Sequence, residues 1–201
     1  MRNYQLVLAS TSPFRQEILK KLQLGFVTAK PDCDETPLPE ETPQQLVMRL
    51  AETKAKSCTV EQPSLVIGSD QVCVIDGEII GKPHTREKAI EQLSRQSGKS
   101  ITFYTGITVW NSETNQADTR LDTFVVHFRD LTEQQIISYV EKEQPYYCAG
   151  SFMCEGLGIA LFKQMEGKDP NTLIGLPLID LVDMLEAQGL SLIHISEPTR
   201  R

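Results

Sequence analysis

Residues 65–75, LVIGSDQVCVI, form an apolar and largely β-branched run that three polar side chains interrupt. Such a run predicts a buried strand. Ser69, Asp70 and Gln71 stand where packing alone would favour more Val or Ile. A buried carboxylate is costly unless it is paired or binds a metal, and burial raises its pKa, which suits a general base. Asp70 is therefore either a strand-end carboxylate that faces water or caps a turn, or a catalytic base.

The composition bounds the class of protein. The chain of 201 residues is long enough for one generous domain or two small lobes. A net charge of −7 argues against a nucleic-acid polymer as partner but allows a small anionic ligand. The five cysteines include no CxxC pair, which favours reduced thiols in the cytoplasm over a disulfide framework or a zinc site. No run is apolar enough to span a membrane or to form a signal peptide, so we expect a cytoplasmic protein without a membrane partner.

The C-terminal segment does not fit the rest of the chain. The last apolar helix pattern stops at Gly189, a natural helix end. Residues 191–201, SLIHISEPTRR, continue without periodicity and resemble a vector-encoded or read-through tail. We therefore expect one domain over residues 1–190, which removes His194 as a catalytic candidate.

The N-terminal strand and helix meet in a hydroxyl-rich turn. Residues 6–9 predict a short buried strand, and Ser10 follows it; Ser12 suits a helix N-cap and Pro13 its first position. Free N–H groups at such a helix start favour an anion. Arg15 opposes the helix dipole, a local conflict of the kind found at functional positions. The alternative is a plain strand-to-helix connection with a surface arginine.

A carboxylate-rich loop precedes the next helix. Prolines exclude regular structure from Asp32 to Thr42, and the acidic side chains of this loop are either solvated or hold a divalent metal. A capping box at Thr42 then opens a helix. Lys54 continues the apolar stripe of that helix, so it is either a snorkelling lysine or a cation aimed into a cleft.

Alternating strands and helices follow the central strand. Asp76-Gly77 predicts a type I′ hairpin, and Lys82 between Gly81 and Pro83 sits in a rigid turn. A helix is expected from about Thr85 to Gln96. The remaining expectations are strands over Ile101 to Trp110 and Thr123 to Phe128, joined by a polar Asn111–Asp122 connection, a capping box at Thr132, and a strand over Ile159 to Phe162.

The elements predict an α/β domain with a mixed sheet. Open α/β sheets bind ligands at the edge where strands end. The polar candidates for that edge are Ser10, Ser12, Arg15, Lys54, Asp70 and Lys82. Glu155, enclosed by Cys154 and Gly156, is either exposed in a turn or a ligand contact, and its pattern does not choose.

These motifs in order resemble the Maf family of nucleotide pyrophosphatases. The matching stretches are residues 10–15 (STSPFR), 34–37 (DETP), 68–71 (GSDQ), 81–83 (GKP), 149–151 (AGS) and 175–178 (GLPL). The resemblance runs from about residue 4 to residue 189, and the ordered set is far more specific than any single motif.

The resemblance implies an elongated α/β fold, similar to that of inosine triphosphate pyrophosphatase (the Maf/Ham1 fold), with two lobes around a cleft. It implies hydrolysis of a nucleoside triphosphate to the monophosphate and pyrophosphate with Mg²⁺ or Mn²⁺, and a homodimer. Asp70 would be the general base, and Glu35 with Asp70 would hold the metal. Arg15, Lys54 and Lys82 would neutralise the phosphates, and the turn from Ser10 to Ser12 would add donors.

Three positions indicate the branch of the family. Members that act on dTTP and UTP carry Arg, Thr and Gln where this chain has Phe14, Gln71 and Glu155. An aromatic, Gln and Glu resemble the branch that prefers 7-methyl-GTP, whose cationic base stacks on an aromatic ring and matches a carboxylate. The alternatives are a pyrophosphatase for canonical or modified pyrimidine nucleotides and a nucleotide-binding regulator of septum formation.

This interpretation sets a geometric condition on the central strand. Asp70 and Gln71 are neighbours, and neighbouring strand residues point to opposite faces. For both to reach one ligand, the strand must end or bend near Gly68. A regular strand with only one of the two facing the cleft would count against the pairing.

Overall fold

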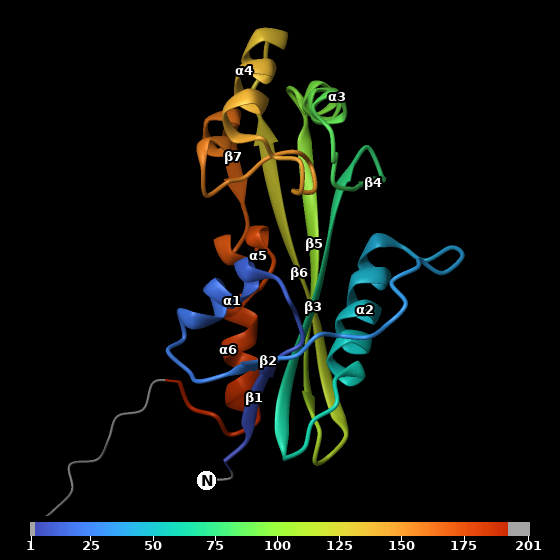
Figure 1. The fold of residues 1–201 in the computed structure, drawn as a ribbon, viewed down its shortest axis with the longest axis vertical. Coiled ribbons are helices and arrows are strands. Elements are labelled where there is room, and N and C mark those ends of the chain that lie inside the picture. The colour runs from blue at the N-terminus through green and yellow to red at the C-terminus, as the bar shows by residue number, and fades with distance from the viewer. Residues whose placement is uncertain (1–2, 193–201) are drawn as a thin grey trace, which may run out of the picture.

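A mixed seven-stranded sheet with helices on both faces forms the protein, which is described by a computed structural model over residues 3–192 (Figure 1). The strands are β1 (Gln5–Leu8), β2 (Val27–Thr28), β3 (Ser64–Ile75), β4 (Glu78–Ile80), β5 (Ser100–Asn111), β6 (Gln116–Phe128) and β7 (Phe162–Glu166). The helices are α1 (Pro13–Lys20), α2 (Pro43–Ser57), α3 (Arg86–Gln96), α4 (Glu133–Glu143), the 3₁₀-helix η1 (Leu157–Leu161), α5 (Pro170–Ile174) and α6 (Leu178–Ala187). The predicted α/β class with a mixed sheet is confirmed. Residues 193–201 of the expected tail lie outside the described residues.

Three long antiparallel strands, β3, β5 and β6, run along the length of the molecule (Figure 1). β1 pairs with β3 in parallel from Ser64 to Ile67, and β4 pairs with β3 from Cys73 to Ile75. Between these two partners, residues 68–72 of β3 pair only with β5 among the strands of residues 3–192. The sheet therefore has a short open edge at the GSDQ motif.

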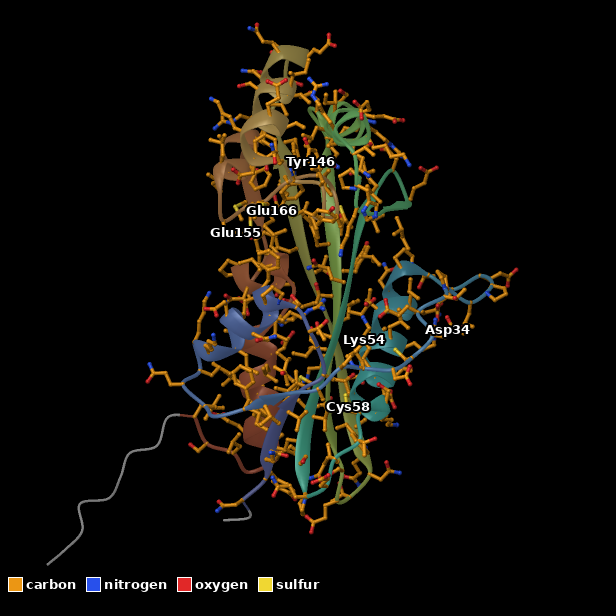
Figure 2. All side chains as sticks on the ribbon, viewed as in Figure 1. Asp34, Lys54, Cys58, Tyr146, Glu155 and Glu166 are labelled. Atoms are coloured by element: carbon orange, nitrogen blue, oxygen red, sulfur yellow. The ribbon has the colours of Figure 1, made fainter. Side chains whose placement is uncertain are left out.

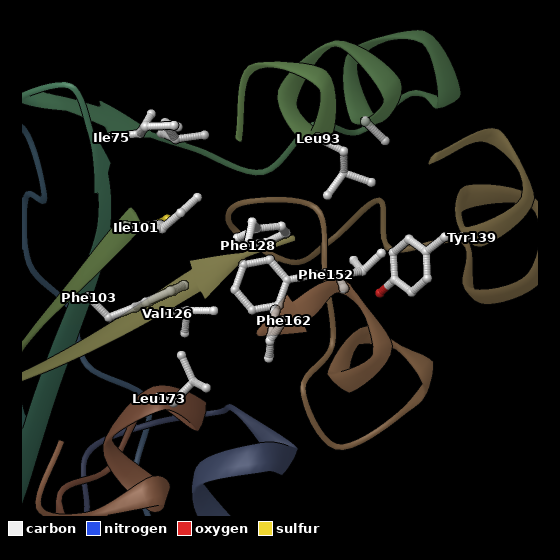
Figure 3. Close-up of a cluster of buried hydrophobic side chains, with 14 of the residues drawn as sticks. Ile75, Leu93, Ile101, Phe103, Val126, Phe128, Tyr139, Phe152, Phe162 and Leu173 are labelled. Atoms are coloured by element: carbon white, nitrogen blue, oxygen red, sulfur yellow. The ribbon is translucent and has the colours of Figure 1, made fainter. Parts of the chain in front are cut away.

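The side chains pack into two main hydrophobic cores, one toward each end of the sheet. One core lies under α3, α4 and β7 and is built around Phe128, Phe152 and Phe162 (Figure 3). These rings meet edge to face with centroids 5.1–5.4 Å apart, an arrangement that adds about 0.5–1.5 kcal/mol per pair beyond area burial. The other core packs α1 and α6 against β1, β3 and β5 through residues such as Leu19 and Leu181. The fold thus has two lobes joined by the long strands.

The local signals for helix starts and the hairpin are confirmed. The Ser12 hydroxyl caps α1 by accepting from the Arg15 N–H, and both capping boxes, at Thr42 and at Thr132, are formed. Asp76 and Gly77 have φ of 49° and 78°, as the two central residues of a type I′ turn require. No helix within residues 3–192 is both long and apolar enough to cross a bilayer.

Two expectations about elements are wrong, and one helix was missed. β6 begins at Gln116, so most of the expected polar connection is strand; the residues from Gln116 to Asp122 pair with Asn111 to Thr105 of β5, and Asp122 is buried. Residues 157–161 form η1 instead of a strand, and β7 begins only at Phe162; a Cβ on Gly158 would lie 2.2 Å from the Met153 carbonyl oxygen, so η1 packs closely there. The helix α5, a single turn capped by Asp169, was not expected from the residue pattern.

Candidate active site

A cavity of about 570 Å³ opens between the two lobes, a size typical of small-molecule sites. The turn before α1, the acidic loop, α2, the open edge of β3, the turn around Lys82, the segment from Tyr147 to Glu155 and α5 all contribute to its wall. Every residue predicted for the site except Asp70 lines this cavity. The structure therefore brings together side chains that are up to 145 positions apart, from Ser10 to Glu155.

Lys54 lies between two carboxylates at the base of the cavity. Its Nζ is 2.8 Å from Oδ1 of Asp70 and 3.1 Å from Oε1 of Glu35. The side chains of Lys54 and Asp70 are 9% and 12% exposed, whereas that of Glu35 is 59% exposed. The ammonium compensates a carboxylate that would be costly to bury alone. Lys54 is thus the cleft-directed cation and not the snorkelling lysine (Figure 2).

The expected strand end or bend near Gly68 is absent from the described strand, and that expectation is wrong. β3 pairs with β5 without a register shift from Leu65 to Val74, so Asp70 and Gln71 point to opposite faces. Asp70 faces α2 and reaches the cavity wall through Lys54, whereas Gln71 lines the cavity and faces α5. The strand is regular and only Gln71 lines the cavity, which counts against the expected pairing of Asp70 and Gln71 side by side on one ligand; the two side chains flank the open edge of the strand instead.

Two glycines let α2 come close enough for Lys54 to reach Asp70. A Cβ on Gly68 would lie 2.0 Å from the Ala51 carbonyl oxygen, and a Cβ on Gly106 would lie 2.2 Å from that of Val47. Gly106 is the β5 partner of Asp70. The backbone of α2 therefore rests on bare strand backbone, and this close approach sets the position of Lys54.

Arg15 is anchored to the far end of the chain. Its Nε donates to the Gly175 carbonyl at 2.8 Å, and the Ser69 hydroxyl donates to the same oxygen at 2.9 Å. Burial lowers the pKa of Arg15, while the charges of Asp70 and Glu35 oppose that shift. The guanidinium remains charged near neutral pH, since its ordinary pKa is above about 12. Its two Nη groups donate to no described residue and are available to an anion.

The hydroxyl-rich turn before α1 forms as predicted. The Ser12 N–H donates to the Ser10 hydroxyl at 3.1 Å, and the Ser12 hydroxyl accepts from Arg15 N–H at 3.3 Å. Both serines line the cavity. Together with Lys82 they make this wall a set of donors and cations suited to phosphate oxygens.

The remaining wall is aromatic and acidic. Phe14 is 46% exposed although it is apolar, and Tyr147 is 74% exposed; both line the cavity. The Tyr147 ring contacts the His84 ring edge to face, with the ring centroids 6.0 Å apart. Glu155, also exposed, lies in the segment before η1 (Figure 2). Sequence reasoning missed Tyr147; its place beside Tyr146 in the stretch that holds Glu155 was the available signal.

Comparison with known proteins places the chain in a family. Residues 5–188 match the family described as Maf-like protein. The chain belongs to the Maf family. Relatives from Vibrio vulnificus and Vibrio cholerae, each named 7-methyl-GTP pyrophosphatase, are 67% and 68% identical to it over 193 residues, which is 96% of this chain and all of theirs. The family predicted from the sequence is confirmed.

The Maf fold is also found in distant structures. The Ham1 protein of Staphylococcus aureus aligns with a TM-score of 0.53 at 16% identity, over 92% of this chain and 99% of that one. A HAM1 protein from Coxiella burnetii gives a TM-score of 0.52 at 16% identity, over 92% of this chain and 100% of that one. These likenesses confirm the predicted fold class.

A divalent cation fits the donors of this Maf site. One oxygen of Glu35 and one of Asp70 lie 3.1 Å and 2.8 Å from the same Lys54 nitrogen. Within residues 3–192, no three His, Cys, Asp or Glu side chains converge on a point that could hold a metal by themselves. Mg²⁺ is typically held by one or two carboxylates with phosphate oxygens and water completing its shell. Glu35 and Asp70 suit a metal that arrives with a phosphate ligand.

The thiols of the Maf cavity are expected to be unreactive. Burial, and after it the Glu155 carboxylate, raise the pKa of Cys154 to about 12 and also raise the pKa of Cys148. Since the thiolate is the nucleophile, iodoacetamide near neutral pH should alkylate folded Cys154 at least about 100-fold more slowly than unfolded Cys154. The rate should rise about tenfold per pH unit. Mass spectrometry of the Cys154 peptide, with urea-unfolded protein as control, checks this. Alkylation at the unfolded rate would contradict it.

Proposed function

We propose that this chain is a nucleoside triphosphate pyrophosphatase that converts 7-methyl-GTP into 7-methyl-GMP and pyrophosphate. The observation that carries the proposal is one cavity that combines Arg15, Lys54 and Lys82 with Phe14 and Glu155. The names of relatives that are 67% and 68% identical support the same substrate. A triphosphate needs the cations, and a methylated, cationic base needs the aromatic ring and the carboxylate.

In this proposal the cationic wall binds the triphosphate. The free Nη groups of Arg15 and the exposed ammonium of Lys82 contact phosphate oxygens, while Lys54 holds Asp70 at 2.8 Å in a fixed orientation. Bound by Glu35 and Asp70, Mg²⁺ or Mn²⁺ would neutralise phosphate charge. Catalysis of phosphoryl transfer rests mainly on such positioning and charge neutralisation.

In this proposal Asp70, which reaches the cavity wall through Lys54, accepts the proton of the attacking water. As the water oxygen bonds to the α-phosphorus, the bond from that phosphorus to the bridging oxygen of the β-phosphate breaks. Pyrophosphate leaves with that bridging oxygen, and the water proton passes to the Asp70 carboxylate. Lys54 lowers the cost of keeping this carboxylate ionised at a site that is 12% exposed.

The base is recognised at the aromatic and acidic wall. Methylation at N7 makes guanine cationic, and a cation is attracted to the face of Phe14 and of Tyr147. The carboxylate of Glu155 accepts from the N1–H and N2–H₂ groups of guanine and matches the positive charge.

A substrate panel tests the proposed function. Purified protein is incubated with 7-methyl-GTP, GTP, UTP, dTTP and dCTP in the presence of Mg²⁺ or Mn²⁺, and pyrophosphate release is measured. We expect 7-methyl-GTP to have the highest kcat/KM. Faster turnover of UTP or dTTP would overturn the proposal in favour of a pyrimidine nucleotide pyrophosphatase.

The double substitution Phe14→Arg with Glu155→Gln should shift the preference toward UTP. The new guanidinium would repel a cationic base, and the neutral amide would lack the charge that attracts it. We expect the kcat/KM ratio of 7-methyl-GTP to UTP to fall by at least about 10-fold, a change of about one to two kcal/mol. Leu38→Arg with Glu40→Gln, at the exposed tip of the acidic loop, is the matched control. An unchanged ratio would remove Phe14 and Glu155 from base recognition.

The proposal includes a homodimer in the cytoplasm. The family resemblance supports the dimer, and the reduced thiols within the described residues, Cys33, Cys58, Cys73, Cys148 and Cys154, suit a reducing compartment. Light scattering on purified protein tests the dimer, because the monomer mass is 22.6 kDa and a dimer would have twice that mass.

A further inference from the structure

The side-chain amide of Gln71 is held by three acceptors in the wall of the cavity. Its Nε2 donates to the Thr105 hydroxyl at 2.9 Å and to the Thr172 carbonyl at 2.7 Å, with the Leu173 carbonyl at 3.4 Å. An amide nitrogen has two protons, so these acceptors use both of them. The oxygen, Oε1, accepts from no described residue, and Gln71 lines the cavity.

The opposite orientation of this amide is excluded by its neighbours. A flipped amide would place Oε1 against the carbonyl oxygens of Thr172 and Leu173, which have no proton to donate. The Thr105 hydroxyl cannot relieve this, because it donates its own proton toward the Thr172 carbonyl at 3.4 Å. Thr105 is completely buried and is the β5 partner of Gln71 on the same face of the sheet.

The helix α5, which carries two of the acceptors for Gln71, is held in place by side-chain contacts of its own. The Thr172 hydroxyl donates to the buried Asp122 carboxylate, and Lys168 lies 3.7 Å from that carboxylate and 2.5 Å from Asp180. Asp169 caps α5 by accepting from the Asn171 N–H. These contacts hold α5 in place, and with it the Thr172 and Leu173 carbonyls. The carbonyls therefore do not move with the Gln71 amide.

We propose that Thr105 is a positioning residue that makes Gln71 an acceptor-only reader of the base. With both protons of Nε2 engaged, only Oε1 can contact a ligand. Glu155 lines the same cavity and is also an acceptor. Two acceptors match a base with neighbouring N–H donors, as on the N1–H and N2–H₂ edge of guanine, and disfavour a base whose edge is mostly carbonyl oxygen, as in uracil. This inference rests on the proposed function of the same cavity and adds how guanine is distinguished.

The variants Thr105→Val and Thr105→Ser test the role of the hydroxyl. Val keeps the shape but removes the acceptor on β5, so only the α5 carbonyls hold the amide and the position of Oε1 in the cavity is less well fixed. We expect kcat/KM for 7-methyl-GTP to fall about 10-fold, mainly through KM. GTP has the same edge and should fall in parallel, whereas kcat/KM for UTP should stay within about twofold. Thr105→Ser restores the hydroxyl and should behave like the wild type.

Each outcome decides the inference. An equal loss on all three substrates, or no loss on any, would overturn it, since a merely structural role affects every substrate alike. If Thr105→Val does not fold, Gln71→Glu replaces it. The carboxylate introduced by Gln71→Glu offers acceptors and a favourable charge but cannot donate to the α5 carbonyls, so 7-methyl-GTP and GTP should again lose against UTP; a gain for them would overturn the inference. A wild-type protein that prefers UTP would instead refute the proposed function itself.

Discussion

The substitution Asp70→Asn is expected to lower kcat for 7-methyl-GTP by about 10²–10⁴-fold, the usual contribution of a general base. Asn has nearly the same shape but cannot take a proton from water. Lys54 keeps its contact with Glu35, so the cationic wall remains and the nucleotide should still bind. Pyrophosphate release measures the turnover, and isothermal titration with 7-methyl-GTP measures the binding.

Asp76→Asn is the matched control. Asp76 lies on the hairpin that β3 enters, is exposed, and pairs with Lys99 far from the cavity, so its loss should leave kcat unchanged. An Asp70→Asn protein that turns over at the wild-type rate would remove Asp70 as the base. The same variant separates the enzyme from a regulator of septum formation, because a regulator would keep its cellular effect without turnover.

The substitution Gly68→Ala is expected to destabilise the fold and the site together. The new Cβ would lie 2.0 Å from the Ala51 carbonyl oxygen and 2.9 Å from the Ala55 nitrogen, both in the backbone of α2. Neither atom can move without shifting the helix. We expect a loss of at least about 3 kcal/mol in the free energy of unfolding, at the upper end for overpacked cores, and a fall in Tm of about 6–12 °C. Calorimetry measures both.

Gly25→Ala provides the control, since no atom of the described part of the chain lies within 4 Å of a Cβ placed there. It should change the free energy of unfolding by no more than about 0.5 kcal/mol. Any Gly68→Ala protein that folds should also turn over more slowly, because a displaced α2 withdraws Lys54 from Asp70. Wild-type stability in Gly68→Ala would show that α2 does not rest on β3 as described.

Local chemistry made much of the fold predictable. The caps at Ser12, Thr42 and Thr132 and the turn at Asp76-Gly77 depend on neighbours within four residues, so their residue types were sufficient. The start of β6 depends instead on pairing with β5, because polar residues such as Arg120 are acceptable on the solvent side of a strand. The length of β5 and its pairing with β6 set where β6 begins, and the β-propensity of the residues does not.

The candidate site also contains some residues that local sequence predicts and others that only strand pairing identifies. Ser10, Arg15 and Lys82 were predicted because turns and helix starts have recognisable residue patterns. Thr105 and Gly106 were not, because their roles come from the register of β5 on β3, which pairs them with Gln71 and Asp70. The opposite faces of Asp70 and Gln71 follow from strand geometry alone, but the open edge that makes both useful depends on where β1 ends and β4 begins.

The two hydrophobic cores share the backbones of β3, β5 and β6, and this has a thermodynamic consequence. If either core melted alone, the long strands would lose side-chain support along part of their length while staying paired along the rest. The lobes therefore unfold as one cooperative unit. A destabilising change at Phe162, which belongs to the aromatic core and does not line the cavity, thus reduces the fraction of molecules in which the cavity exists at all.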